Sequence, residues 1–487
     1  MTKRLKNRIL FLGSLGLLAS SASAETLREA LAKAYATNPT LTGARAGQRA
    51  NDENVPIAKS RGRPGLDLSA AYTENLQTSS SASPARQAAG RLNFDVPIYQ
   101  GGAVRNAIRA ADSRVDTGQA NLRGTEASVF SQVVAAYMDV LRDEAIVGLN
   151  RNQVKVLKTN LEATRDRFEV GDLTRTDIAQ SESRLALAQS QLEGAESNLI
   201  SSRERYIQLV GDEPDDLQQP PPLPNLPETP DLAVEKALAD NPDLIAAKKN
   251  QDAARYDVGS AKAARLPKVS LVADKSYANF LNSLQSFIPG FNTSQTAENA
   301  SAAVQLTLPL YQGGAPSAQI RQAQARSSQA IEQMIAAERS VIAQTRSAFA
   351  SFRASNAVIA SSEAAVAATA LSLEGVRAEN TVGNRSILDI LNAEQEYLNT
   401  QVQLVSARRN SYVAAFSVLA AMGKAEARDL GIEGGALYDP EVNYRRVKGQ
   451  LWDWADDPKP QQQATDTRAV PEPDAGVPAY VEMGPKQ

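Results

Sequence analysis

The side chains of this chain that could do chemistry are carboxylates, amines and guanidinium groups, because the sequence contains no cysteine and no histidine. Disulfides, thiolate nucleophiles, most zinc sites and histidine acid–base catalysis are therefore excluded. The Gly-Gly pairs of the chain are not followed by Lys-Ser or Lys-Thr, so no phosphate-binding loop of the Walker type is present. We expect no enzymatic activity, no cofactor and no metal site.

Two acidic residues follow Val-Gly dipeptides and are the most informative charges in the sequence. Asp177 follows Val170-Gly171, and Asp389 follows Val382-Gly383. A carboxylate just after a turn suits the positive N-terminus of a helix. If symmetry-related copies line a narrow pore, the same carboxylates repel one another and favour cations. The residues alone leave both interpretations open.

These acidic residues lie in a sequence that contains an internal repeat. The segment Pro97-Ile-Tyr99-Gln-Gly101-Gly102 recurs as Pro309-Leu-Tyr311-Gln-Gly313-Gly314. At the same offset each Val-Gly dipeptide has its counterpart, and Glu182 recurs as Glu394. Asn38-Pro39 recurs as Asn241-Pro242. The repeat is too long for a solenoid, so each copy is expected to be half of one subunit.

The repeat and the composition predict the organisation of the chain. We expect a secretion signal in 1–24, a first repeat in 25–213, a Pro-rich linker in 214–230, a second repeat in 231–424, a C-terminal equatorial segment in 425–455 and a disordered tail in 456–487. Within the repeats we expect strand pairs at about 64–98 and 267–310, long helices at about 103–169 and 315–380, and return helices at about 175–210 and 387–422. Basic residues, an apolar run and Ala22-Ser23-Ala24 indicate the signal.

The strand pairs alternate apolar and polar residues with a period of two. Even positions are apolar in Leu66–Tyr72, Leu92–Ile98 and Ala302–Leu310, and odd positions are apolar in Val269–Ala273. One interpretation is a pair of hairpins on a soluble core. The other places the apolar face against outer-membrane lipid and the polar face against a water-filled lumen. No nearby helix is apolar enough to supply a core, which favours the second interpretation.

The long helices carry apolar residues every seven positions, as in Val140, Val147, Val154 and Leu161, which indicates coiled-coil packing. No stretch after the signal approaches the apolar length of a transmembrane helix, so we expect none. The formal net charge of −3 disfavours nucleic acid as a partner.

At these motifs the sequence resembles the TolC-like family of outer-membrane efflux and type I secretion channels. The residues that carry the resemblance are the two Pro-x-Tyr-Gln-Gly-Gly turns, the Val-Gly turns and the run from Val382 to Glu394. It implies a mainly α protein with a small β part. Each internally duplicated subunit would belong to a homotrimer with a barrel of about 12 strands in the outer membrane, continuous with a periplasmic helical barrel.

The resemblance also implies partners and site residues. The partners are a periplasmic adaptor (membrane fusion) protein and an inner-membrane ABC exporter or proton-driven pump. The expected docking tips are Val170, Gly171, Asp172 and Leu173, with Val382, Gly383, Asn384 and Arg385. The expected gate comprises Asp389 as constricting carboxylate, Asn392 where a second carboxylate is usual, and Arg385 linked toward Thr176 and Asp177. The alternative is a periplasmic coiled-coil adaptor or structural protein.

Overall fold

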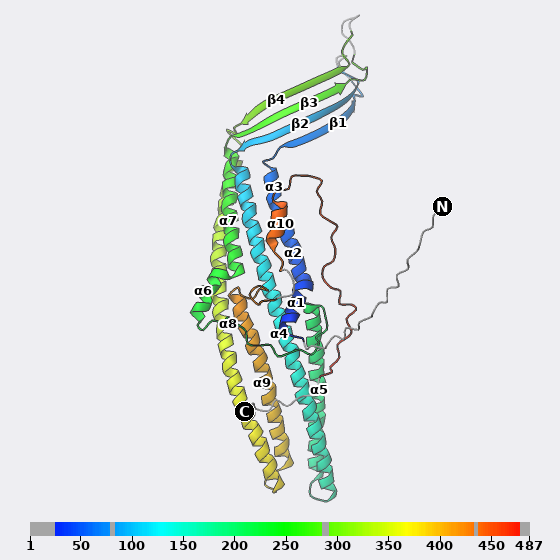
Figure 1. Ribbon diagram of the computed structural model, residues 1–487, viewed down its shortest axis with the longest axis vertical. Coiled ribbons are helices and arrows are strands. Elements are labelled where there is room, and N and C mark those ends of the chain that lie inside the picture. Colours follow the sequence, from blue (N-terminus) through cyan, green and yellow to red (C-terminus); the bar gives the residue numbers. More distant parts are fainter. Residues whose placement is uncertain (1–24, 78–82, 285–291, 433–436, 478–487) are drawn as a thin grey trace, which may run out of the picture.

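The computed structural model describes residues 25–77, 83–284, 292–432 and 437–477. The predicted signal in 1–24 and the end of the tail after Val477 lie outside these ranges. The described protein is a long rod of helices with a four-stranded sheet tilted across one end (Figure 1). The two helical hairpin tips form the opposite end.

The two halves of the chain follow the same plan, except that the α-helix α3 of the first half is replaced by a 3₁₀ turn in the second. The first half contains α1 (Leu27–Thr37), α2 (Pro39–Asp52), α3 (Asn54–Ser60), β1 (Gly65–Glu74), β2 (Arg86–Gln100), α4 (Ala103–Glu169) and α5 (Arg175–Val210). The second half contains α6 (Pro230–Asp240), α7 (Pro242–Lys262), the 3₁₀ turn η1 (Ala263–Arg265), β3 (Lys268–Asn279), β4 (Thr296–Thr307), α8 (Ala315–Thr381) and α9 (Ile387–Ala421). A short helix, α10 (Pro440–Val447), follows.

Glycine residues fix where the long helices begin. The N-cap residues of α4 and α8 are Gly102 and Gly314, with φ of 83° and 81°. Side chains other than glycine rarely adopt this left-handed conformation, so the chain turns from strand to helix where the sequence predicted. Each long helix has 67 residues, a length of roughly 100 Å at 1.5 Å per residue.

The Asn-Pro motifs join three helices at one point in each half. The Asn38 side chain accepts hydrogen bonds from the backbone N–H groups of Thr40 (2.9 Å) and Leu41 (3.3 Å) and caps α2. Its amide nitrogen donates to the Leu209 carbonyl near the end of α5, at 2.9 Å. Asn241 repeats this arrangement and donates to the Ala421 carbonyl at the end of α9, at 2.9 Å. The motif therefore anchors each return helix as well as stopping a short one.

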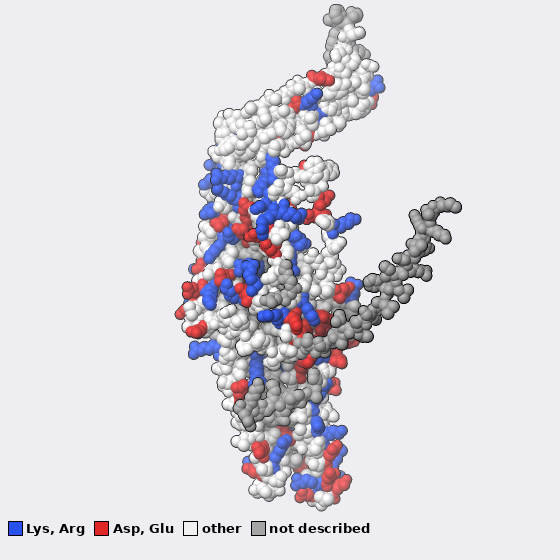
Figure 2. Space-filling model, viewed as in Figure 1, with Lys and Arg blue, Asp and Glu red and all other residues white. Residues whose placement is uncertain are grey.

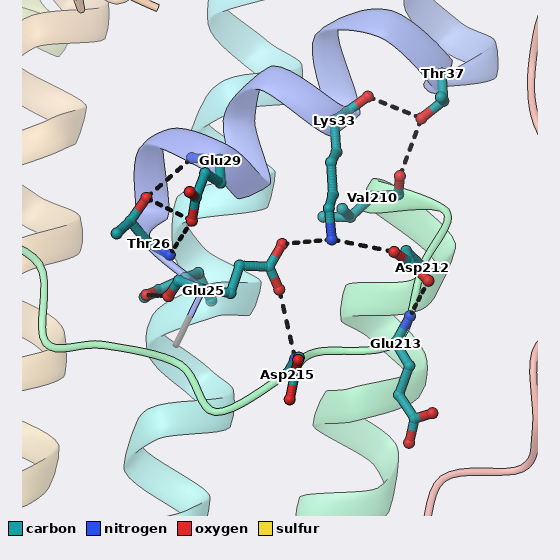
Figure 3. Close-up of polar contacts among 10 residues, drawn as sticks. Glu25, Thr26, Glu29, Lys33, Thr37, Val210, Asp212, Glu213 and Asp215 are labelled. Carbon is teal, nitrogen blue, oxygen red and sulfur yellow. Dashed lines mark hydrogen bonds and ion pairs between the residues drawn. The ribbon is translucent and has the colours of Figure 1, made fainter. Parts of the chain in front are cut away.

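The start of the described chain packs against the same region (Figure 3). The side chain of Glu25 is almost fully buried and forms an ion pair with Lys33, Oε1 to Nζ, at 2.9 Å. Lys33 also pairs with Asp212 after the end of α5, at 3.0 Å. These contacts tie α1 to the chain just after α5. Leu27 and Leu31 of α1 also belong to the apolar cluster that includes Phe130 and Tyr206.

The sheet is antiparallel in the order β1-β2-β3-β4, so two hairpins lie side by side. Its register places one set of apolar side chains on a single face, because partners across an antiparallel pair point the same way. These residues are Leu66, Leu68, Leu92, Phe94, Val96, Val269, Leu271, Val304 and Leu306. The opposite face carries polar ladders such as Asp67, Asn93, Asp274 and Ser301. In all four strands the residues predicted to be apolar therefore lie on the same face of the sheet, which confirms the prediction.

The apolar face of the sheet has no cover within the described protomer. Leu68 is 79% exposed and Val304 is 68% exposed, and the sheet stands clear of the helices in Figure 1. The hairpins therefore do not pack on a soluble core. The outer strands β1 and β4 each pair on one side only, so the sheet has two open edges.

Two expectations differ from the structure. Helix α8 does contain an 18-residue window apolar enough to span a membrane by length and composition, although only 11% of it is buried. Small residues such as alanine give this window its hydropathy, which a search for large apolar side chains overlooks.

The second difference concerns the tail. Residues 456–477 form no helix or strand, but the end of this segment contacts the rod. The buried guanidinium of Arg203 donates to the carbonyls of Asp474 (2.7 Å) and Gly476 (2.8 Å). Arg151 donates to the carbonyl of Ala475 at 2.8 Å. The described part of the tail is therefore held along α4 and α5, and disorder stays a prediction for the residues beyond it.

Replacing Asn38 with aspartate tests the three-helix junction. Aspartate keeps the acceptor that caps α2 but places a carboxylate against the Leu209 carbonyl, where the amide now donates. We expect a loss of about 1–3 kcal/mol, the usual cost of leaving a buried polar group unsatisfied. Thermal unfolding of the detergent-solubilised protein measures it. The control is Asp439→Asn at the exposed N-cap of α10, which should change stability little; equal effects would contradict the anchoring role.

Candidate functional site at the helical tips

The tip of each hairpin is a glycine turn with matching geometry. Gly171 and Gly383 have φ of 86° and 82°. The N–H of Asp172 donates to the Arg167 carbonyl, and that of Asn384 donates to the Glu379 carbonyl. This pattern ends a helix with a left-handed residue and satisfies carbonyls that the helix leaves free. Both tips are therefore set by local sequence.

The tip turns expose apolar side chains at the far end of the rod. Val170 is 81% exposed and Val382 is 70% exposed. A Cβ atom added at Gly171 or Gly383 would meet no atom within 4 Å. The predicted docking residues thus lie on open surface, Leu173 being half-buried.

Asp177 and Asp389 hold the first turns of the return helices. The Asp389 carboxylate accepts hydrogen bonds from the Ser386 N–H (2.9 Å) and hydroxyl (2.7 Å). Asp177 accepts the same two bonds from Thr174 at 2.8 Å and 2.7 Å. These bonds lower the pKa of both carboxyls below the ordinary value, because they stabilise the charged form. Both residues are therefore ionised at neutral pH.

The predicted link from Arg385 to Thr176 or Asp177 is not formed within the protomer. Among the described residues Arg385 instead pairs with Glu379 on its own hairpin, Nε to Oε2, at 2.7 Å. The Asn380 amide donates to the Arg385 carbonyl at 2.8 Å and ties the turn further. Arg385 thus stabilises its own tip in the single chain.

Asn392 has a partner that the sequence did not suggest. Its side-chain oxygen accepts a hydrogen bond from the Arg184 guanidinium of α5 at 2.6 Å. This contact joins the two hairpins. Beneath it, Leu157, Ala188 and Leu391 form a small buried cluster that also spans both hairpins.

A second link between the hairpins centres on Glu394, which is 2% exposed. Its Oε1 atom accepts a hydrogen bond from the Asn160 amide of α4 at 2.9 Å and pairs with Arg377 of α8 at 3.1 Å. Its counterpart Glu182 pairs with Arg165 at 2.6 Å but is 49% exposed. The repeat therefore conserves the ion pair in both halves and buries only one. Sequence comparison of the halves could have found the pair, but not its burial.

The strand-to-helix turns at the other end also follow the repeat. Gly101 and Gly313 both have positive φ. Pro97 and Tyr99 flank a register shift between β2 and β3. Tyr99 is 48% exposed and Tyr311 is 88% exposed. A Cβ at Gly101 would lie 2.8 Å from that of Leu266, whereas Gly313 has open space, so only the first turn is tightly packed.

Comparison with known proteins identifies the family. The family model described as outer membrane efflux protein matches residues 30–212 and 233–424, one range in each half. The chain belongs to this family. The outer membrane efflux protein BepC of Brucella suis is 34% identical over 434 residues, which cover 89% of this chain and 92% of BepC. The outer membrane protein TolC of Vibrio cholerae is 27% identical over 86% of this chain and 95% of its own.

Solved structures show the same fold. The CmeC outer membrane channel of Campylobacter jejuni superposes with a TM-score of 0.73 at 17% identity, covering 93% of this chain and 98% of CmeC. The expected fold class and outer membrane location are confirmed, and this outer membrane efflux protein is an exit duct that extends into the periplasm. The family decides against the alternative of a periplasmic adaptor.

Replacing Glu394 with glutamine tests the buried link between hairpins. We expect local opening of the α9 tip to become easier by about 1–2 kcal/mol, because the charge-assisted contacts that the buried carboxylate makes with Asn160 and Arg377 are weakened. Amide hydrogen exchange over 387–398 measures this as roughly tenfold faster exchange. The matched control is Glu182→Gln, an exposed pair whose loss changes exchange in α5 by less than about 1 kcal/mol. Equal changes in both hairpins would show that burial gives Glu394 no special role.

Proposed function

We propose that three copies of this outer membrane efflux protein close into a continuous duct that passively conducts substrates out of the cell. One observation carries the proposal. The sheet has two open edges and one apolar face, and it continues directly into two long helical hairpins. Three four-stranded sheets give a barrel of about 12 strands, which is wide enough for a channel. Channels of this family are trimers that work with efflux or secretion systems.

The partners we propose are a periplasmic adaptor at the tips and an inner-membrane ABC exporter or proton-driven pump behind it. The exposed valines and empty space around Gly171 and Gly383 support docking at this end. Energy comes from the pump, because the duct has no nucleotide-binding loop of its own. The exported substrate is then chosen by the pump.

We place the gate at the return-helix tips, with Asp389 as the constricting charge. Three Asp389 carboxylates in a narrow entrance repel one another, attract cations and slow anions. Their ionisation is supported by the capping bonds from Ser386. Asn392, being neutral, adds no second ring of charge. The adaptor opens the gate by binding the open arrangement of α8 and α9 more tightly than the closed one.

Replacing Asp389 with asparagine tests the gate in planar bilayers. Wild-type trimers should conduct ions with a preference for cations and should be blocked by multivalent cations. Asp389→Asn should reduce both, because the charge at the constriction is removed. A wild-type protein that stays monomeric and water-soluble without detergent would contradict the proposed duct itself.

The matched control for this variant is Asp177→Asn. It removes the same capping carboxylate from the other hairpin, so both variants lose similar helix-capping energy, about 0.5–1 kcal/mol. Selectivity should change only in Asp389→Asn. Unchanged selectivity in that variant removes Asp389 from the constriction.

Replacing Gly383 with phenylalanine tests docking at the tip. The side chain projects into open space in the described protomer, so within the protomer its cost is the strain of the left-handed backbone at this position rather than a clash. We expect export to fall while trimers survive. Gly383→Asn is the control, since asparagine tolerates the left-handed backbone and is small. Export that survives the phenylalanine variant would place the adaptor elsewhere.

A further inference from the structure

Both tryptophans of the chain lie in one short segment that follows α10. Trp452 is 71% exposed, Trp454 is 83% exposed, and the adjacent Leu451 is 73% exposed. Single exposed apolar residues are ordinary, but three large ones within four positions form an apolar surface with a high cost in water. The described protomer leaves this surface uncovered.

Two hydrogen bonds place the segment at the base of the sheet. The Lys59 amine donates to the Lys448 carbonyl at 2.8 Å, and the Arg63 guanidinium donates to the Gln450 carbonyl at 2.7 Å. Lys59 lies at the end of α3, and Arg63 lies just before β1 begins at Gly65. The chain after α10 accordingly passes beneath the start of β1 (Figure 1).

The apolar band of the sheet begins at this level. Leu66, the second residue of β1, is 66% exposed on the apolar face. The chain that leads into the tryptophan segment therefore lies near the lower end of the apolar face of the sheet. Tryptophan prefers the interface between hydrocarbon and water, where its ring is covered and its N–H finds acceptors.

The charges of the neighbouring junctions fit phospholipid headgroups. The junctions between helices and strands in 58–66, 97–110, 258–268 and 308–321 contain lysine and arginine but no aspartate or glutamate. Basic side chains gather just below the sheet in Figure 2. Such a basic band complements phosphate groups at a membrane surface. The segment itself is acidic: Asp453 lies between the tryptophans and Asp456 follows them, both exposed, whereas Asp457 is paired with Arg446 at 2.7 Å. The basic band therefore belongs to the neighbouring junctions, and the apolar side chains carry the contact of the segment with lipid.

We propose that Leu451–Trp454 is an interfacial anchor whose indoles insert among the phospholipid headgroups of the periplasmic leaflet. Through the Lys59 and Arg63 bonds the anchor ties α3 and the start of β1 to the membrane plane. It thereby fixes the depth at which the barrel sits, as interfacial anchors do. The inference rests on the placement of the sheet in the outer membrane.

Intrinsic fluorescence tests the anchor without added labels, because both tryptophans of the chain belong to it. The full protein is reconstituted into phosphatidylethanolamine–phosphatidylglycerol vesicles in which part of the phospholipid carries bromine on its acyl chains. We expect these lipids to quench about half or more of the emission, since the indoles lie against the acyl boundary. Quenching by aqueous acrylamide should fall on transfer from detergent to vesicles. Trp452→Phe and Trp454→Phe, each with one remaining tryptophan, report on the two indoles separately.

Two outcomes overturn the anchor. Emission that acrylamide quenches fully and brominated lipid does not would place the indoles in water. Emission protected from both quenchers would show that a second copy of the chain covers them. Heat-resistant trimers that withstand carbonate extraction from the same vesicles report on membrane insertion independently. If the trimers insert but brominated lipid does not quench their emission, the anchor is disproved and the duct is not. If the protein fails to insert, the proposed duct is disproved.

Discussion

The unpaired edges of the sheet constrain everything else in this protein. Strands β1 and β4 each present a row of backbone N–H and C=O groups without a neighbour. In hydrocarbon no water satisfies such groups, so a lipid-embedded sheet must close on itself. Four strands cannot do this, and the missing neighbours must come from other copies. The same closure brings the helical hairpins of those copies together into a tunnel. It also supplies cover for the little-buried apolar window of α8.

The two halves of the protein follow the same plan and repeat the same capping contacts. They differ in how deeply equivalent residues are buried. Asn38 and Asn241 perform the same double capping in each half. The Arg165–Glu182 and Arg377–Glu394 pairs occupy equivalent positions, but only Glu394 is buried, against Asn160 of α4. A buried carboxylate is costly to leave unpaired, whereas an exposed one is not. The second hairpin is therefore tied to the first at a point that has no equivalent on the other side.

Much of the fold followed from local signals. Alternation gave the phase of all four strands, because side chains in a strand alternate between faces. Glycines that need positive φ marked the ends of the long helices. Contacts between distant segments left no such local signal. The partner of Asn392 is Arg184 on the other hairpin, and Arg203 holds the tail. Both contacts depend on how the hairpins and the tail are brought together in space.

In the gate that we propose, the number of links between the hairpins sets how much free energy an opening partner must supply. A shift of the gate from almost fully closed to almost fully open requires about 5.5 kcal/mol of differential binding. The Arg184–Asn392 bond is solvent-exposed and contributes at most about 1 kcal/mol. The buried Glu394 contacts add roughly 1–3 kcal/mol. The summed free energy of two such links in each of three protomers is of the same order as the differential binding energy that is needed to open the gate. In the gate that we propose, links of this size favour the closed state when no partner is bound and allow the binding of one partner to open it.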